Sequence, residues 1–272
     1  MKNRLFKGIG LLLVLAVLCT VTAFADDTVR IGSATDLAAL GGQELTGKIE
    51  LTQDIDMTGV AMEPIVSFVG EFNGNGYTIK NLAISAELAE NYTTKGAALF
   101  AAFSGTARDV VFENPTITLT GGNNVCTAVL CGVIGEDGAT IENVGIVGGS
   151  ISIESAKTTR TGGLVGDAEN TSLTVKNCFT EANVAYTGSS TKPSAHYVGG
   201  MLGCMGYADL AFENCAVLGD VSAHDSAGYA GGFVGFINSS NTGHTIDFTN
   251  CYFSGKVAGG NAYGFAYSGR YA

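Results

Sequence analysis

The sequence predicts an all-β solenoid, in which short strands of successive coils stack into parallel sheets. Three observations predict it. A unit of about 34 to 37 residues recurs along most of the chain, each copy carries short apolar and polar alternations, and glycine-rich turns separate them while helix-forming runs are rare. A repeat of this length indicates a solenoid, and the strand periodicity favours stacked strands over stacked helices.

The repeat is clearest when each copy is aligned on one polar residue, an asparagine or an aspartate. The aligned residues are Asn81, Asp109, Asn143, Asn177, Asn214 and Asn250. The residues two positions earlier are all apolar: Ile79, Ala107, Ile141, Val175, Phe212 and Phe248. The residues one position earlier are all polar: Lys80, Arg108, Glu142, Lys176, Glu213 and Thr249. One position later stand Leu82, Val110, Val144, Cys178, Cys215 and Cys251. Because this pattern breaks strict alternation, we expect the chain to bend at the asparagine, which tolerates left-handed conformations. A further short strand is expected around Val184, Val221 and Val257.

Glycine-rich motifs that open the later copies carry a family resemblance. They are Gly162-Gly-Leu-Val-Gly166, Gly199-Gly-Met-Leu-Gly203 and Gly231-Gly-Phe-Val-Gly235, each followed by a strand like Val175-Lys-Asn-Cys178. With the upstream run from Glu71 to Leu82, they resemble the GLUG repeats of bacterial surface proteins, and the resemblance covers residues 28 to 272. It implies a right-handed parallel β-helix in an extracellular protein. Some relatives add a zinc metalloprotease domain, but its His-Glu-x-x-His motif does not occur here, so that activity does not carry over.

The chain divides into a leader, an entry segment and the repeats. Residues 1–25 combine three early basic residues, an apolar run from Ile9 to Val21 and Ala23-Phe24-Ala25, which is typical of a secretory signal peptide. Residues 26–63 form the N-terminal cap and entry strand, and the run from Ser33 to Leu40 predicts a short capping helix. Residues 64–272 hold the GLUG-type repeats, so that the whole solenoid has about six to seven coils, the last one incomplete.

Charge and leader together limit the location and the partners. The signal peptide predicts an extracellular protein, either secreted or associated with the cell surface. No second hydrophobic span follows it, and the net charge of −11 repels nucleic acid and anionic lipid. We therefore expect neither a nucleic-acid partner nor stable insertion into a membrane.

Three cysteines share one column and leave their redox state open. Cys178, Cys215 and Cys251 should lie one sheet spacing apart, about 4.8 Å, which is within reach of a disulfide. Earlier coils place Leu82, Val110 and Val144 in this column, so it accepts a medium-sized apolar side chain. A buried ladder of reduced thiols is therefore favoured over a disulfide.

No catalytic, cofactor-binding or metal-binding constellation stands out. The histidines at positions 196, 224 and 244 lie at unrelated offsets in predicted loops, and no nucleophile motif is present. Asp54 and Asp56 offer oxygen ligands for Ca²⁺, but two acids around an isoleucine also describe the outward face of an ordinary strand. We therefore predict a protein that is not an enzyme and holds no cofactor and no metal.

A candidate binding stripe precedes the three Gly-Gly pairs. Arg160, Tyr197 and Tyr229 each stand two residues before such a pair, so stacking should place them in line, where they suit a sugar or a protein side chain. The alternative is that the tyrosines shield the bases of the neighbouring loops. We expect a non-catalytic adhesion, scaffold or binding role toward a host or environmental protein or glycan. The alternative is a β-helix that acts on polysaccharide, as a lyase or hydrolase, or that binds glycan.

The C-terminal coil is expected to be poorly covered. Its short tail holds Tyr263, Phe265, Tyr267 and Tyr271, which can cover part of an apolar cross-section but cannot pair the backbone of a whole coil. An uncovered strand edge invites pairing with another molecule. We therefore predict self-association through the C-terminal edge, or a chain that is a fragment of a longer surface protein.

Overall fold

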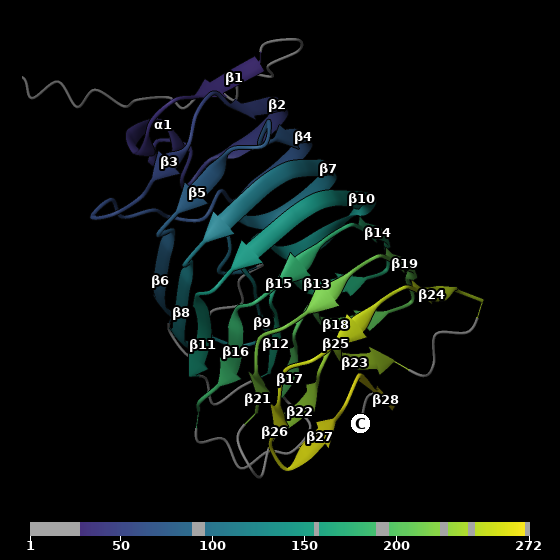
Figure 1. Cartoon of the computed structure of the whole chain (residues 1–272). Helices are drawn as coiled ribbons and strands as arrows, with labels where there is room; N and C mark the ends of the chain where they lie inside the picture. The colour runs from purple at the N-terminus through teal and green to yellow at the C-terminus, as the bar shows by residue number, and fades with distance from the viewer. Residues whose placement is uncertain are drawn as a thin grey trace, which may run out of the picture.

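The computed structural model describes residues 28–88, 96–154, 158–188, 196–223, 228–238 and 243–269. The predicted signal peptide and Tyr271 lie outside the described residues. Within them the chain is a parallel β-solenoid of about five turns with almost no helix (Figure 1). The predicted fold class is confirmed. The number of coils is smaller than the six to seven expected, because the strands before residue 83 pair only within one of the three sheets.

Three parallel sheets run along the solenoid, and we call them sheets A, B and C. Sheet A contains β1 (Thr28–Ile31), β2 (Glu44–Leu51), β3 (Ile55–Asp56), β4 (Ser67–Asn73), β5 (Thr78–Lys80), β7 (Phe100–Glu113), β10 (Cys131–Val147), β13 (Val165–Glu169), β14 (Ser172–Lys176), β15 (Phe179–Thr180), β18 (Leu202–Gly206), β19 (Asp209–Glu213), β20 (Ala216–Val217), β23 (Val234–Asn238), β24 (Ile246–Thr249), β25 (Tyr252–Phe253) and β28 (Ala266–Gly269). Sheet B contains β6 (Ala83–Leu88), β8 (Thr116–Gly121), β11 (Ser150–Glu154), β16 (Asn183–Tyr186), β21 (Val221–Ser222) and β26 (Val257–Ala258). Sheet C contains β9 (Val125–Thr127), β12 (Thr159–Gly162), β17 (His196–Gly199), β22 (Gly228–Gly231) and β27 (Asn261–Tyr263).

A short helix lies beside the first strands. This helix, α1 (Ala34–Ala38), begins after Ser33, whose side-chain oxygen accepts a hydrogen bond of 3.1 Å from the Asp36 N–H. Such a bond satisfies one of the free N–H groups of a helix start. Leu37 is buried, and it joins the same core cluster as residues of β2 and β3. The helix therefore adds a buried side chain to the core at this end of the stack, where Figure 1 shows it beside β3.

Strand register confirms the predicted columns from the second copy onward. Ala107 pairs with Ile141, and the column continues through Val175, Phe212 and Phe248. The polar column pairs Arg108, Glu142, Lys176, Glu213 and Thr249 in the same way. The valine strand is also confirmed, and it extends back to Ile84, Ile117 and Ile151.

The first copy was placed in the wrong column. Ile79 pairs with Ile55 and Phe112 instead of Ala107, and Lys80 pairs with Asp56 and Glu113. Phe72 of β4 is the residue that pairs with Ala107. The physical reason is the length of β7, because its first half continues β4 and its last residues continue β5.

The aligned asparagines turn the chain at a corner, as predicted. Asp109, Asn143, Asn177, Asn214 and Asn250 all have left-handed φ angles, between 52° and 55°. Each later side chain also donates its amide N–H to the side-chain oxygen of the one before, at distances of 2.9 Å for Asn143 to Asp109 and 3.1 or 3.2 Å for the following pairs. The corner is therefore held both by backbone conformation and by a ladder of amides that runs from coil to coil.

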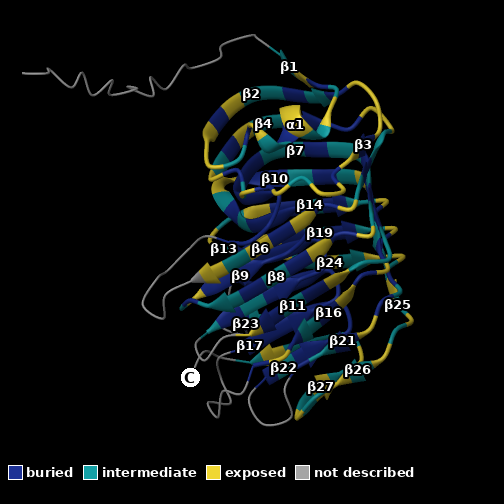
Figure 2. Ribbon diagram, turned by 90° about the vertical axis from the view of Figure 1, so that its left-hand side faces the viewer, coloured by how far each residue is buried: buried dark blue, intermediate teal, exposed yellow. Residues whose placement is uncertain are grey.

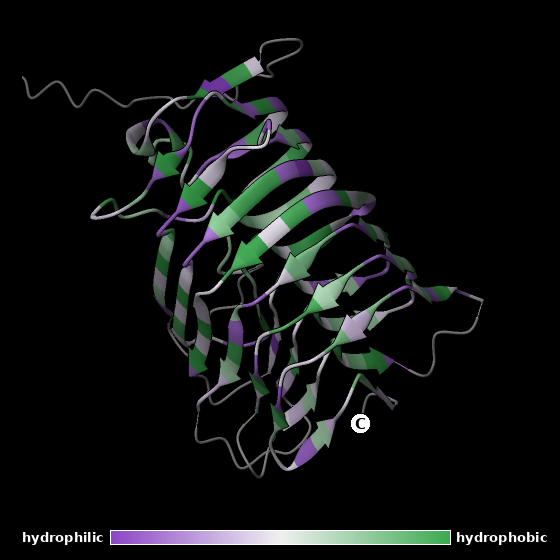
Figure 3. Ribbon diagram, viewed as in Figure 1, coloured by the Kyte–Doolittle hydropathy of each residue, from purple (hydrophilic) through white to green (hydrophobic). Residues whose placement is uncertain are grey.

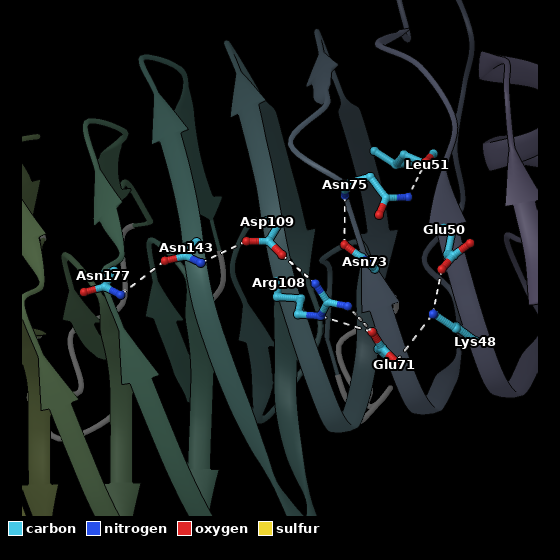
Figure 4. Close-up of polar contacts among 10 residues, drawn as sticks. All are labelled: Lys48, Glu50, Leu51, Glu71, Asn73, Asn75, Arg108, Asp109, Asn143 and Asn177. Atoms are coloured by element: carbon cyan, nitrogen blue, oxygen red, sulfur yellow. Dashed lines mark hydrogen bonds and ion pairs between the residues drawn. The ribbon is translucent and has the colours of Figure 1, made fainter.

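Ion pairs extend this ladder toward the N-terminal end (Figure 4). Asp109 binds the Arg108 guanidinium at 2.6 Å, Arg108 binds Glu71 at 2.7 Å, and Glu71 lies 3.9 Å from the Lys48 ammonium. Lys48 also contacts Glu50 at 2.6 Å. These side chains are about one fifth to one third exposed, so each pair contributes little by itself. Together they link the first coils to the asparagine ladder in one polar line.

A continuous apolar core fills the solenoid. Strands alternate apolar and polar residues along their length (Figure 3), and the apolar residues of the central coils are almost fully buried (Figure 2). Two members of the cysteine column lie within this core, where Cys178 and Cys215 are each 1% exposed, whereas Cys251 in the last coil is only partly buried. The cysteines of the described residues are free thiols, and the Cys178 thiol donates a hydrogen bond of 3.1 Å to the Lys176 carbonyl oxygen.

The last coil is covered much less than the others. None of residues 243–269 is buried, although Phe248 and Val257 occupy columns whose earlier members are almost completely buried (Figure 2). Phe265 of the tail stacks on Phe233 with ring centres 4.9 Å apart and meets Phe248 edge-on at 5.1 Å. The tail therefore covers part of the cross-section, as predicted. Among the described strands, β26 and β27 each have a partner on one side only.

The inward and outward assignments can be tested by substitution in one strand. Val175→Asp places a charge among buried apolar side chains, and we expect the free energy of unfolding to fall by at least about 3 kcal/mol. Thr174→Asp, one residue away on the other face, should change it by less than about 1 kcal/mol. Urea denaturation measures both. Equal losses for the two variants would show that the face assignment is wrong.

Self-association through the C-terminal edge stays a prediction. We expect residues 26–272 to form larger species as concentration rises, because β26 and its neighbours present unpaired backbone groups beside half-covered apolar side chains. Val257→Lys should reduce this association by placing a charge at the edge. Light scattering across a concentration series reports both effects. A monodisperse monomer at the highest concentration would contradict the prediction.

Candidate functional site

The predicted stripe residues are neighbours in sheet C. Arg160 of β12 pairs with Tyr197 of β17, which pairs with Tyr229 of β22. Cys126 precedes this column and Asn261 follows it. The three side chains therefore lie in line, one per coil, as their spacing predicted.

The last glycine of each Gly-Gly-x-x-Gly motif brings sheet A close to sheet C. A Cβ atom at Gly166 would lie 2.7 Å from the Thr127 nitrogen, and one at Gly203 would lie 2.5 Å from the Thr161 nitrogen. Gly235 repeats the arrangement, with 2.7 Å to the Val198 nitrogen. No other residue fits such a contact, so the motif allows two backbones to touch. The side chains beside the contact form a cluster of their own, separate from the main core.

Arg160 is held by two acids from β13. Its guanidinium lies 3.3 Å from an Asp167 oxygen and 3.4 Å from a Glu169 oxygen. The Arg160 side chain is 13% exposed and that of Asp167 only 5%. An ion pair this deeply buried loses much of its hydration, so its value depends on the contacts around it. We call these three residues and the adjoining Cys126, Cys204 and Tyr197 the Arg160 cluster.

Burial controls the protonation of this cluster. It raises the pKa of Asp167 to about 7, although Arg160 acts in the opposite direction. Burial also raises the pKa of the Cys126 thiol, whose sulfur lies 4.0 Å from Asp167. Loss of hydration disfavours the Arg160 charge, but the nearby acids outweigh it and raise the pKa of Arg160 overall. Near neutral pH the cluster therefore holds a charged arginine, a neutral thiol and a carboxyl group close to its midpoint.

Aromatic rings continue the column toward the C-terminal end. Tyr197 is 4% exposed and stacks on Phe236 with ring centres 4.4 Å apart. Tyr229 is half-buried and stacks on Tyr267 at 4.4 Å with nearly parallel rings. Exposure is lowest at Tyr197, and Tyr229 and the adjoining Tyr267 of β28 present partly open rings that a ligand can reach.

The aspartates considered for Ca²⁺ are engaged in local hydrogen bonds. Asp54 accepts from the Thr78 N–H at 2.9 Å, and Asp56 accepts from Thr58 and from the Asn81 side chain. The described residues hold no group of three or more His, Cys, Asp or Glu side chains arranged to bind a metal. Within the same described residues, no helix is long and apolar enough to cross a membrane.

Sequence reasoning missed two features around the stripe. It placed His196 in a loop, which is wrong, because His196 is fully buried in β17, 3.1 Å from the Thr159 hydroxyl and stacked on Tyr186. It also missed Asp167 and Glu169 as partners of Arg160. A signal was present for Asp167, because the equivalent residues in the next coils are Cys204 and Phe236, and an acid in an apolar column needs a partner.

Comparison with known proteins supports the fold. No protein-family model matches the chain, and no curated protein matches it. The chain is similar to the crystal structure of a putative immunoglobulin A1 protease from Bacteroides ovatus, with a TM-score of 0.64 and 19% sequence identity. The match covers 90% of this chain and 86% of that one. It fits a β-helix protein, while the GLUG repeats themselves stay a resemblance.

The comparison corrects one expectation. We predicted that the chain is not an enzyme, and the structural neighbour carries the name of an enzyme, a protease. That prediction is contradicted. What the two proteins share at 19% identity is the fold, and the substrate in the neighbour's name belongs to that protein.

The buried carboxyl group of Asp167 predicts a specific pH dependence. Its folded pKa of about 7 lies above the unfolded value of 3.8, so the folded state binds the proton more tightly. The stabilisation is therefore complete below about pH 4 and is lost as pH rises toward and through 7. Asp167→Asn removes this titration. Relative to the variant, the wild type should lose on the order of 2 kcal/mol of unfolding free energy between pH 5 and pH 8.

Denaturation of both proteins at several pH values measures the difference. Glu136→Gln, at an exposed position of β10, is the control for a change of one carboxylate. Parallel curves for wild type and Asp167→Asn would mean that Asp167 does not titrate in this range.

Proposed function

We propose that the chain is a secreted or surface-exposed β-helix of the GLUG-repeat kind that binds a protein or glycan through the stripe face of sheet C. The stack of Tyr229 on Tyr267 is the observation that carries this proposal. Both rings are half-buried, so each is fixed in place by its neighbours while part of its surface remains open. Rigid, partly exposed tyrosines lose little entropy on binding, and they are frequent anchors of protein interfaces.

The Arg160 cluster lies beside the outer rings, in the preceding coils of the same column. Arg160 is tied to Asp167 and Glu169. Tyr197 is packed on Phe236 and also stacks on Tyr229 with ring centres 5.9 Å apart, so Tyr197 helps to position the outer rings. A ligand would contact Tyr229 and Tyr267 directly and would meet Arg160 only at its small exposed surface. The proposed ligand site therefore lies at the C-terminal half of the stripe.

The structural neighbour suggests the first ligand to test. Because it is named a putative immunoglobulin A1 protease, immunoglobulin A1 is the first protein to offer to this chain, alongside a glycan array. Surface plasmon resonance with residues 26–272 measures binding. Gel electrophoresis of the same mixtures after incubation reports whether the offered protein is cut.

Substitution of the outer rings tests the face. Tyr229→Ala should weaken binding of whichever ligand is found by at least about tenfold, because aromatic anchors commonly contribute 2 kcal/mol or more. Tyr252→Ala is the matched control, since Tyr252 is 54% exposed on β25 of sheet A. Equal binding by wild type and both variants would show that the ligand site lies elsewhere. The proposal would be overturned if the wild type bound neither the array nor immunoglobulin A1 and Tyr229→Ala cut immunoglobulin A1 at the same rate as the wild type.

A further inference from the structure

A surface hollow lies at the N-terminal edge of sheet B, away from the stripe face. It is an open depression of about 570 Å³, lined by the turn at residues 57–61 together with Asn81 and Ala83. Val60 and Ala61 supply the accessible apolar side, and Thr58 and Asn81 supply polar groups. The hollow opens to solvent, and most of the residues that line it are exposed.

A fixed negative charge adjoins the polar side of the hollow. One oxygen of Asp56, Oδ1, accepts hydrogen bonds from the Thr58 N–H at 3.0 Å, the Thr58 hydroxyl at 2.7 Å and the Asn81 amide at 2.9 Å. The bonds from Asn81 and Thr58 lower the pKa of Asp56 to about 2, so it is ionised at neutral pH. The nearby cation Lys80 contacts Glu113 at 3.5 Å. Among the hydrogen bonds within the described residues, none ends on the second oxygen of Asp56.

The strand beside the hollow is an edge strand. Within the described residues β6 pairs with β8 and with no strand on its other side. The Thr116 N–H donates to the Leu82 carbonyl, so Leu82 and every second residue after it direct their backbone groups toward β8. Ala83, Ser85 and Glu87 therefore direct their N–H and C=O groups outward. This row begins at Ala83, which itself lines the hollow.

We infer that the hollow and the β6 edge form one site for an extended, basic segment of a partner protein. The segment adds to β6 as a further strand, and a lysine side chain enters the hollow with its aliphatic stem on Val60 and Ala61 and its ammonium group at Asp56. Backbone pairing supplies affinity in this mode of recognition, and the pocket beside the edge supplies selectivity. The chain's net charge of −11 favours a cationic partner. This site is independent of the stripe face.

A designed peptide tests the site directly. The probe is fluorescein-labelled Thr-Val-Thr-Lys-Thr-Val-Thr, titrated with residues 26–272 and followed by fluorescence anisotropy. We expect saturable binding, weakened by about tenfold or more when leucine replaces the lysine or when alternate peptide nitrogens are methylated. Methylation removes the donors of the probe and leaves the protein unchanged.

Two protein variants separate the contributions of edge and charge. Ser85→Pro removes an outward N–H from an edge strand, where proline is tolerated, and should weaken binding with little change in melting temperature. Asp56→Asn should weaken binding of the lysine peptide and leave that of the leucine peptide unchanged. Asp137→Asn, an exposed aspartate of β10 with the same loss of charge, is the matched control and should bind like the wild type. No saturable binding at millimolar peptide, or equal binding by the methylated peptide, would overturn the inference.

Discussion

Parallel backbone pairing between neighbouring coils is the interaction on which the rest of the structure depends. Each strand finds its partners one coil before and one coil after it, so a residue's neighbours along the stack are the other members of its own column. The corner must then have the same shape in every coil. The left-handed asparagines provide that shape, and their amide ladder joins successive corners at distances near 3 Å. Core columns, charge pairs and the stripe all follow from this single register.

Columns could be predicted from sequence where coil lengths are nearly equal. From Asp109 to Asn250 the spacing stays at 34 to 37 residues, and the residues one and two positions before each aligned residue pair as predicted. The prediction for the first copy was wrong because two segments carry the same apolar, polar, asparagine pattern, one around Asn81 and one around Asn114. Only hydrogen bonding distinguishes them: the Asn81 N–H donates to Glu113, directly before Asn114. Spacing alone gave the wrong choice between two equivalent sequences.

Packing between sheets could not be predicted in the same way. A column in the sequence predicts which residues lie above and below a side chain in the stack. It does not predict which residues of another sheet contact that side chain. Arg160 is an example. Its neighbour along the stack was predicted from the column, but the two acids that bind it come from β13, which the column does not include. The glycine at position 166 makes that contact by letting β13 approach sheet C. An exposed stripe was expected, and its first two members are instead nearly covered.

The uneven covering of the solenoid links binding to folding. Residues 243–269 have the least buried surface of the described chain, and Tyr267 belongs to them. Its ring stacks on Tyr229 of the coil before, so the outer part of the stripe bridges a well-covered coil and the least covered one. In a stack whose stability is a sum over neighbouring coils, the end coil opens most readily. A molecule bound across these two rings would add its binding free energy to the coil with the least buried surface. Binding at this end would therefore also stabilise the last coil against local unfolding.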